Sequence, residues 1–251
     1  MQIGFTSTSF RQIKNIERIV KIAAACHVDC IEWGGDIHVK NVNDAKKAKD
    51  LCDQAGIAIC SYGSYYRVGC CDKDEWLRIC EIAKAMNAKS IRVWLGTKNS
   101  EETDEKTYRV LVSDLISMCM VAEKYGLVVC PECHDNTFNN NTNAFLRIHH
   151  DVACKNFRTY FQSRYKKLDY DLNRIEATID MLELIHISYS EQTREQFPKF
   201  NLCYIDSLLD KIVSVGFNGT ILVEYTYFFT YLGFANSMKR SVQKIRKKVG
   251  T

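Results

Sequence analysis

The chain has 251 residues, of which 46% are hydrophobic and 25% are charged, and its net charge is +4. These proportions are close to those of an average globular protein, and they exclude a disordered chain, a collagen-like chain and a simple coiled coil. The pI of about 8.4 lies below the range that marks nucleic-acid-binding domains, and no apolar run reaches the roughly 18 residues that a membrane span requires. We therefore expect neither a nucleic-acid partner nor a membrane-spanning segment.

Eight short apolar segments alternate along the chain with longer segments of helical periodicity. The short segments are apolar on both faces and rich in β-branched residues, which is typical of strands buried in a parallel sheet. They centre on residues 3–5, 30–33, 57–60, 90–94, 127–130, 157–161, 184–187 and 221–224. Eight strand–helix units predict an α/β fold, namely a (β/α)8 TIM barrel with a parallel eight-stranded core. No linker interrupts this pattern, so we expect a single domain over residues 1–251.

The twelve cysteines are spread over the whole chain. Most of them fall in apolar segments, where cysteine packs as a small hydrophobic residue. Cys130 and Cys133 have C-x-x-C spacing, but no second pair follows at the distance of a zinc ribbon. Because the sequence opens without a charged-then-apolar signal segment, we expect reduced cysteines and a cytoplasmic protein.

Polar side chains stand at the ends of the last four predicted strands. In a barrel of this kind the active site lies at the C-terminal ends of the strands. The fifth strand leads into Glu132, the sixth into Gln162, the seventh carries His186 and the eighth ends at Glu224. Since side chains alternate between the two faces of a strand, these four residues share one mouth if their faces point inward.

Two carboxylates buried in one mouth need a cationic partner, and two kinds of partner are open. A divalent metal ion together with a neutral imidazole from His186 is one solution. In the other, Glu132 and Glu224 form salt bridges with Arg92 or Lys98, and His186 is a hydrogen-bonded core residue. Four successive strand ends favour the functional interpretation, because the fold gathers them in one place.

The order and spacing of these segments resemble the xylose isomerase-like TIM barrels, the group of sugar-phosphate isomerases and epimerases that also contains endonuclease IV. The resemblance covers nearly the whole chain, and no single segment is diagnostic by itself. Its most specific part is the stretch 216–224, which is similar to the last strand of the family. The other matching stretches are residues 3–8, 30–38, 90–96 and 131–134.

The resemblance implies one divalent metal ion, Mn, Mg, Co or Zn, held by the ends of strands five to eight. The family uses Glu, Asp, His and Glu at these positions. Glu132, His186 and Glu224 match, whereas Gln162 stands where the family has Asp. An amide oxygen can ligate a hard cation but carries no charge, so we expect weaker metal binding than with three carboxylates.

The resemblance also implies a small sugar or sugar-phosphate substrate. The family reaction is proton transfer at the carbon next to a carbonyl, through an enediolate that the metal stabilises. Glu132 and Glu224 are then the acid/base pair. From their positions at strand ends, we expect the substrate to be held by His38, Tyr66, Arg92, Trp94, Lys98 and His134.

Three other functions use the same barrel. An inosose-type dehydratase and a non-catalytic sugar-binding barrel both stay open at this stage. A nuclease resembling endonuclease IV is not expected, because it needs a three-metal cluster with more His and Asp ligands than these strand ends offer. The sequence leaves the oligomeric state open, with a homo-oligomer among the alternatives.

Overall fold

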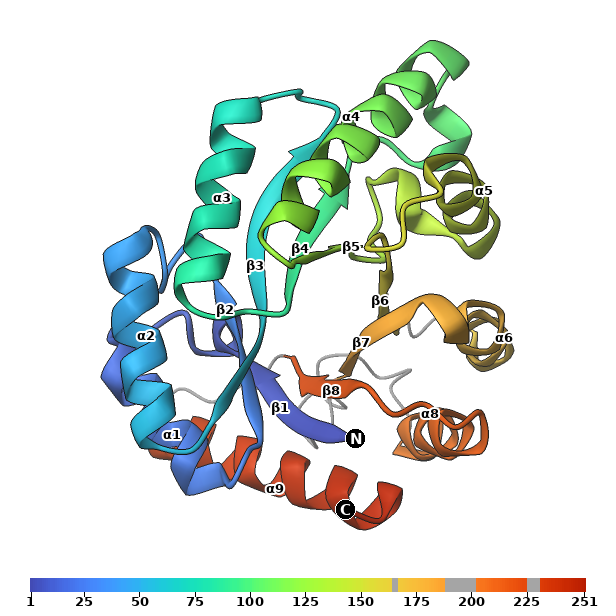
Figure 1. Cartoon of the computed structure of the whole chain (residues 1–251). Coiled ribbons are helices and arrows are strands. Elements are labelled where there is room, and N and C mark those ends of the chain that lie inside the picture. The colour runs from blue at the N-terminus through green and yellow to red at the C-terminus, as the bar shows by residue number, and fades with distance from the viewer. Residues whose placement is uncertain (164–166, 188–201, 225–230) are drawn as a thin grey trace.

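A computed structural model describes residues 1–163, 167–187, 202–224 and 231–251. Eight parallel strands form one sheet that rolls into a nearly closed barrel, with helices around its outside (Figure 1). The strands are β1 Gln2–Thr6, β2 Cys30–Gly34, β3 Ala58–Val68, β4 Ser90–Leu95, β5 Val128–Pro131, β6 Thr159–Gln162, β7 Leu182–Ile187 and β8 Thr220–Val223. All eight predicted strands are confirmed, as is the barrel.

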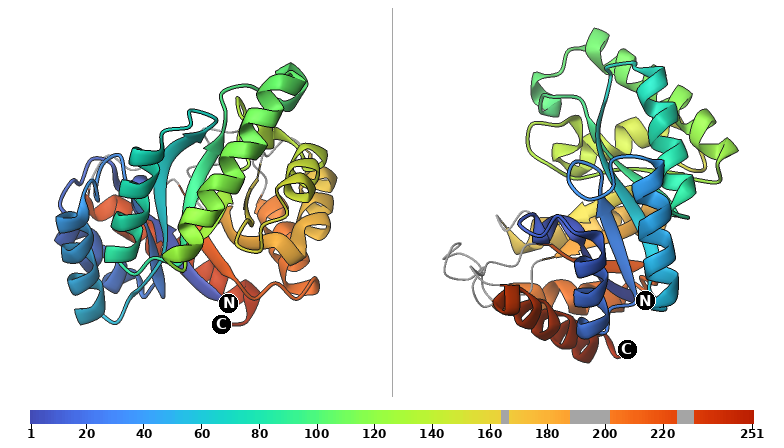
Figure 2. Two further views of the ribbon diagram at one scale, coloured as in Figure 1. Left: turned by 45° about the horizontal axis from the view of Figure 1, so that its top comes forward. Right: turned by 90° about the vertical axis from the view of Figure 1, so that its left-hand side faces the viewer.

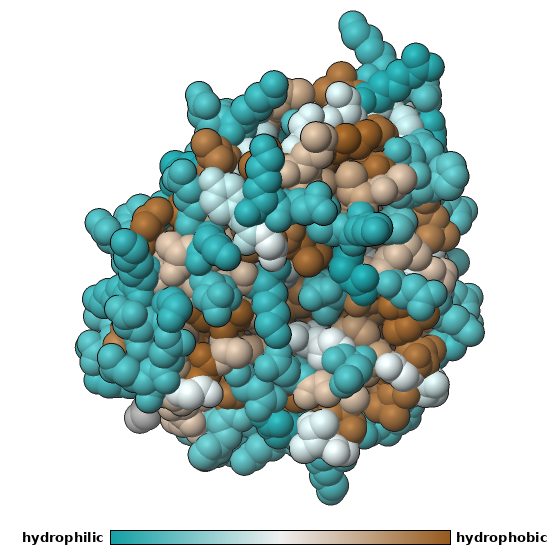
Figure 3. Space-filling model, viewed as in Figure 1, coloured by the Kyte–Doolittle hydropathy of each residue, from teal (hydrophilic) through white to brown (hydrophobic). Residues whose placement is uncertain are grey.

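The helices surround the sheet in chain order, and both chain ends lie close together on one side (Figure 2). The helices in the described residues are α1 Ile16–Cys26, α2 Val42–Gln54, α3 Lys73–Ala85, α4 Glu105–Lys124, α5 Thr142–Val152, α6 Leu168–Thr178, α8 Leu202–Ser214 and α9 Tyr231–Val249. None of these helices is both long and apolar enough to cross a membrane. Hydrophilic side chains cover most of the face seen in Figure 3, and hydrophobic ones lie between them in small groups.

Local sequence explains where the helices begin. Five N-cap side chains accept hydrogen bonds from backbone N–H groups in the first turn of their helix, which satisfies donors that have no partner within the helix. These N-caps are Asn15, Asn41, Asp72, Asp104 and Asn141.

The strands run in the order β5-β4-β3-β2-β1-β8-β7-β6, which leaves β5 and β6 as the two ends of the sheet. Two isolated parallel bridges, Val129 with Phe157 and Glu132 with Tyr160, join these ends. Fewer residue pairs therefore join β5 to β6 than join the other neighbouring strands. Glu132 lies at the C-terminal end of this β5–β6 seam.

Strand β3 is longer than the sequence predicted. The expected strand covered residues 57–60, whereas the observed one continues to Val68. Its extension contains three tyrosines, which favour extended backbone. It pairs with β4 a second time, Arg67 opposite Trp94, after a register shift that begins at Gly63. The extension carries β3 past the rim of the barrel on the side of the candidate site.

A layer of side chains fills the barrel interior directly below that site. It consists of Cys30, Cys60, Cys130, Tyr160, Leu184 and Leu222. Two residues further along their strands, on the same face, stand the polar side chains Glu32, Glu132, Gln162, His186 and Glu224. The alternation expected from the sequence is therefore confirmed, and a well-packed floor supports the polar layer.

The twelve cysteines are free, and eight of them are buried. Cys30, Cys60 and Cys130 belong to the barrel interior, where burial raises the pKa of the Cys60 and Cys130 thiols well above the ordinary value. These thiols stay protonated, so they serve as small packing groups.

Candidate active site

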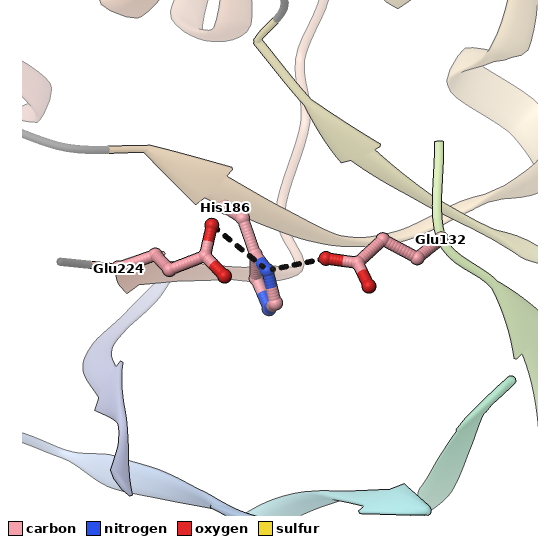
Figure 4. Close-up of side chains that lie close together, drawn as sticks. All are labelled: Glu132, His186 and Glu224. Atoms are coloured by element: carbon pink, nitrogen blue, oxygen red, sulfur yellow. Dashed lines mark ion pairs between the residues drawn. The ribbon is translucent and has the colours of Figure 1, made fainter. Parts of the chain in front are cut away.

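Three buried side chains face one another at the C-terminal ends of β5, β7 and β8. His186 lies between the carboxylates of Glu132 and Glu224 (Figure 4). Its Nδ1 is 3.5 Å from Oε1 of Glu132 and 3.8 Å from Oε2 of Glu224. One candidate ligand atom from each residue lies within 4.8 Å of the other two. The fold thus brings together the three residues that the strand ends predicted.

A third buried carboxylate, Glu32 at the end of β2, completes this cluster. Its Oε1 lies 3.4 Å from Nε2 of His186 and 3.6 Å from Nε of Arg92. Glu32 was not among the residues predicted for the site. The signal was present, because Glu32 follows Cys30 by two residues just as Glu132 follows Cys130. Both ring nitrogens of His186 therefore face carboxylates.

Arg92 lies inside the cluster, fully buried. Its Nη1 donates to Oε2 of Glu132, and its Nε faces Glu32. Trp94, two residues along β4, donates from Nε1 to the same Oε2 of Glu132 at 2.7 Å. Arg92 and Trp94 thus hold one oxygen of Glu132, and the other oxygen points to His186.

Opposite charges compensate the burial of this cluster. Although burial opposes ionisation, the Arg92 guanidinium holds the pKa of Glu132 well below its usual range, and Arg92 with His186 lowers the pKa of Glu32 to about 2. Burial favours neutral His186, yet Glu32 and Glu132 raise its pKa to about 10. Glu224 differs, since burial raises its pKa and the neighbouring carboxylates add to the effect. The two candidate acid/base carboxylates therefore have pKa values shifted in opposite directions.

Gln162 lies beside Glu224, on β6 and opposite His186 in the β6–β7 register. Its Nε2 donates to Oε2 of Glu224 at 2.6 Å. In this orientation the amide nitrogen faces the carboxylate. A half-turn of the amide about its last side-chain bond would present the carbonyl oxygen, the atom that can ligate a cation.

The donor set fits a divalent cation. Carboxylate oxygens of Glu132 and Glu224 and the imidazole Nδ1 of His186 converge, and among the described residues neither ring nitrogen of His186 has a partner within hydrogen-bond geometry. A histidine that ligates a metal usually directs its other nitrogen to a carboxylate, and Glu32 occupies that position behind Nε2. An oxygen-rich site with one imidazole is compatible with Mg, Mn, Co or Zn.

The other predicted substrate-binding residues lie in two places. His134 stacks on Trp94 with ring centroids 5.1 Å apart, so it borders the cluster. The structure places His38, Tyr66 and Lys98 elsewhere. His38 is buried against Trp33 and bonds to the Ile13 carbonyl at 2.9 Å. Tyr66 packs on Trp76, whereas Lys98 is exposed beyond the end of β4.

Comparison with known proteins agrees with this architecture. The model of the xylose isomerase-like TIM barrel family matches residues 20–246, and the chain belongs to this family. Sequence comparison with curated proteins finds no match.

Solved structures of similar fold include two epimerases and a probable dehydratase. D-psicose 3-epimerase superposes with a TM-score of 0.80 at 12% identity over 100% of both chains. The 3-keto-D-glucoside 4-epimerase YcjR of E. coli gives 0.76 at 17% identity, over 98% of this chain and 99% of that one. The probable 3-DHS dehydratase AsbF of Bacillus anthracis gives 0.78 at 14% identity, over 97% of this chain and 98% of that one. At such identities the likeness establishes the shared fold.

The pKa values of Glu32 and His186 predict how the stability of the metal-free protein depends on pH. His186 gains its proton more readily in the folded state, so its stabilising effect is complete below pH 6.5 and is lost as the pH rises through about 10. Glu32 has a lowered pKa, so its effect is complete above pH 4.5 and is lost as the pH falls through about 2. With chelator present, we expect the urea midpoint to be highest between pH 4.5 and pH 6.5, where both effects are complete. His186→Gln should abolish the alkaline decline, and a decline of the same size in that variant would contradict the assignment.

Proposed function

We propose that this chain is a metal-dependent isomerase or epimerase of sugars or sugar phosphates, which moves a proton at the carbon next to a carbonyl. The observation that carries the proposal is the convergence of Glu132, His186 and Glu224 at the C-terminal mouth of the barrel. In TIM barrels that mouth is where active sites lie. Epimerases with the same fold add support, and the twelve free cysteines are compatible with a cytoplasmic protein.

Glu132, His186 and Glu224 are the proposed protein ligands of one divalent ion, with Gln162 as a neutral fourth. When bound there, the ion supplies Lewis acidity toward the carbonyl and the neighbouring hydroxyl of the sugar. The imidazole of His186 must be neutral to ligate a metal ion, and in the metal-free protein its pKa is raised to about 10. Metal binding would therefore release this proton, so we expect metal affinity to increase with pH.

The two glutamates have different proposed roles in moving the proton. Glu224 has a raised pKa and thus accepts a proton more readily than an ordinary carboxylate, which suits a residue that takes the proton and returns it. Glu132 stays ionised because Arg92 and Trp94 hold it, so it is free of a proton and can accept one at the opposite side, as a weaker base than Glu224. Arg92 positions Glu132 in this scheme, in place of the substrate contact expected from the sequence.

Trp94 and His134 form the proposed wall for the sugar. Their stacked rings lie next to Glu132 and give the proposed sugar site an aromatic border, although His134 and the Arg67 guanidinium already lie against the Trp94 ring. His38 and Tyr66 use their polar atoms within the protein, His38 at the Ile13 carbonyl and Tyr66 at the Asp72 carbonyl. Their proposed contribution to substrate binding is indirect, through the loops they brace.

Solvent exchange tests the proposal. The metal-loaded protein is incubated in deuterated water with a panel of ketoses, ketose phosphates and inososes, and proton NMR follows both exchange and product. Exchange at the carbon next to the carbonyl, with an epimer or aldose as product, is the expected result. Exchange followed by loss of water would indicate the dehydratase alternative, which the fold of the probable 3-DHS dehydratase keeps open. Saturable sugar binding without any exchange would contradict an enzyme and favour a binding module.

The replacement Gln162→Asp tests the place of Gln162 in the ligand set. A third carboxylate among the ligands, beside Glu224, should tighten divalent metal binding by about tenfold or more, since it adds charge where an amide had none. Competition with a fluorescent chelator measures the dissociation constant. Gln162→Leu is the control and should weaken binding. An Asp variant that binds metal no more tightly than wild type would remove Gln162 from the site.

A further inference from the structure

A second hollow lies beyond the ends of β3 and β4, next to the candidate active site and separate from it. Its volume is about 360 Å3. The end of β3, the turn after β4 and the start of α4 enclose it. Its charged and hydroxyl-bearing lining residues are Arg67, Thr97, Lys98, Thr103 and Thr107. Two cations line this hollow, and none of the described residues lining it is acidic.

Arg67 is held in place with donors to spare. Its Nη1 donates to the Gly96 carbonyl at 2.7 Å, and its guanidinium carbon lies 4.3 Å from the centroid of the Trp94 ring. No carboxylate pairs with Arg67 in the described parts of the chain, and no ion pair of Lys98 occurs there either. Asp104, which precedes α4, accepts the Thr107 N–H as the helix N-cap; this hydrogen bond lowers the pKa of its carboxyl, and the charge of Lys98 adds to the effect without forming an ion pair among the described residues. A guanidinium whose geometry is fixed and whose charge is not neutralised is suited to binding an oxyanion.

Trp94 connects the two sites. Its Nε1 donates to Glu132 in the polar cluster, while its ring carries the Arg67 guanidinium. Arg67, which lines the hollow, is therefore one side chain away from the carboxylate proposed to act on the sugar.

We propose that this hollow is a phosphate subsite, in which Arg67 and Lys98 bind the phosphate group of a phosphorylated sugar. As a substrate subsite it rests on the proposed function, whereas its ability to bind phosphate does not. The proposed subsite gives Lys98 the substrate-binding role that was expected from the sequence. It also adds Arg67, which was not predicted from the sequence. The substrate class is thereby narrowed from sugars in general to sugar phosphates.

Binding of inorganic phosphate tests the subsite directly. Phosphate is titrated into the metal-loaded protein at constant ionic strength, followed by phosphorus NMR, for wild type, Arg67→Gln and Lys98→Gln. Each replacement should raise the dissociation constant of phosphate by about tenfold, because it removes a charge-assisted contact. Lys106→Gln, at an exposed lysine on the first turn of α4 that lines the neighbouring hollow, should change it by less than about twofold. Unchanged affinity in both test variants, or an equal loss in the Lys106 control, would overturn the proposal.

Two further arms separate the outcomes. Acetate at the same ionic strength should not compete, and competition by acetate as strong as by phosphate would replace the phosphate subsite with a general carboxylate site. In the exchange assay, Arg67→Gln should raise KM for a ketose phosphate by about tenfold without raising KM for the matching free ketose. Phosphate binding without any solvent exchange would support the phosphate subsite and contradict the proposed enzyme activity. Exchange on free sugars without phosphate binding would support the enzyme activity and contradict the subsite. Arg67→Lys, which keeps the charge, should restore part of the phosphate affinity and so distinguishes lost charge from a disturbed turn.

Discussion

Replacing Glu224 with Gln is expected to lower the rate of solvent exchange into the sugar by about a thousandfold, within the range that general acid/base catalysis contributes. Gln has the shape of Glu but cannot carry the proton, and the Gln162 amide already beside it can still hydrogen-bond to the new side chain. The loss should appear in kcat, because the Glu224 carboxylate acts in the proton-transfer step more than in substrate binding. Exchange followed by proton NMR at saturating substrate measures it.

The matched control for Glu224→Gln is Glu183→Gln. Glu183 is on β7 but near the N-terminal end of that strand, at the other end of the barrel from Glu224, and its partly exposed carboxylate pairs with Arg158 at 3.0 Å. Its replacement should leave the exchange rate near that of wild type. If Glu224→Gln retained more than about a tenth of the wild-type rate with full metal content, Glu224 would not be the group that moves the proton.

The second large effect concerns stability. Arg92→Met should lower the free energy of unfolding of the metal-free protein by about 3–5 kcal/mol, the range measured when one partner of a buried ion pair is removed. Met fills a similar volume but leaves His186 as the remaining cationic side chain that faces the two buried carboxylates of Glu132 and Glu32. Urea denaturation with chelator present measures the change.

Two variants make the Arg92 prediction specific. Arg158→Met removes a cation from the half-exposed pair with Glu183 and should cost about 1 kcal/mol or less. In the Arg92→Met background, Glu132→Gln should restore part of the lost stability, whereas in the wild-type background it should destabilise. Additive effects of the two replacements would show that Arg92 and Glu132 do not interact.

The strand ends carried most of the information that the sequence held about the site. Glu132, His186 and Glu224 stand two residues after interior apolar side chains, and strand alternation alone sends them to the same face. The family match over residues 20–246 confirms the resemblance and the barrel. Eight repeated strand–helix units made that prediction robust, because an error at one boundary does not change the topology.

The orientation of Arg92 and the partners of the two Glu132 oxygens depend on distances across the barrel, which a sequence pattern does not contain. Arg92 was expected at the substrate, but its side chain turns inward to Glu132 and Glu32. The salt-bridge alternative left open for Glu132 is therefore realised on one of its oxygens, while the other faces His186. The salt bridge thus occupies one oxygen of Glu132, and its other oxygen is the one that the proposed metal site would use.

The extension of β3 limited what the sequence could say about the rim. The residues that were expected to follow the third strand belong to β3. Within this extension Arg67 is the register partner of Trp94 on β4. Register after an irregularity is set by the neighbouring strand, so the juxtaposition of Arg67 with Trp94 could not be predicted from spacing.

Metal stoichiometry tests whether Glu132, His186 and Glu224 hold one divalent ion. The purified protein is dialysed against Mn, Mg, Co or Zn, and bound metal is measured by inductively coupled plasma mass spectrometry for wild type, His186→Ala and the surface control His150→Ala. His150 is exposed on α5, away from the cluster. We expect about one ion per chain in wild type and in the control, and clearly less in His186→Ala, because the variant lacks the imidazole ligand. Equal stoichiometry in all three proteins would contradict the ligand set and the function built on it.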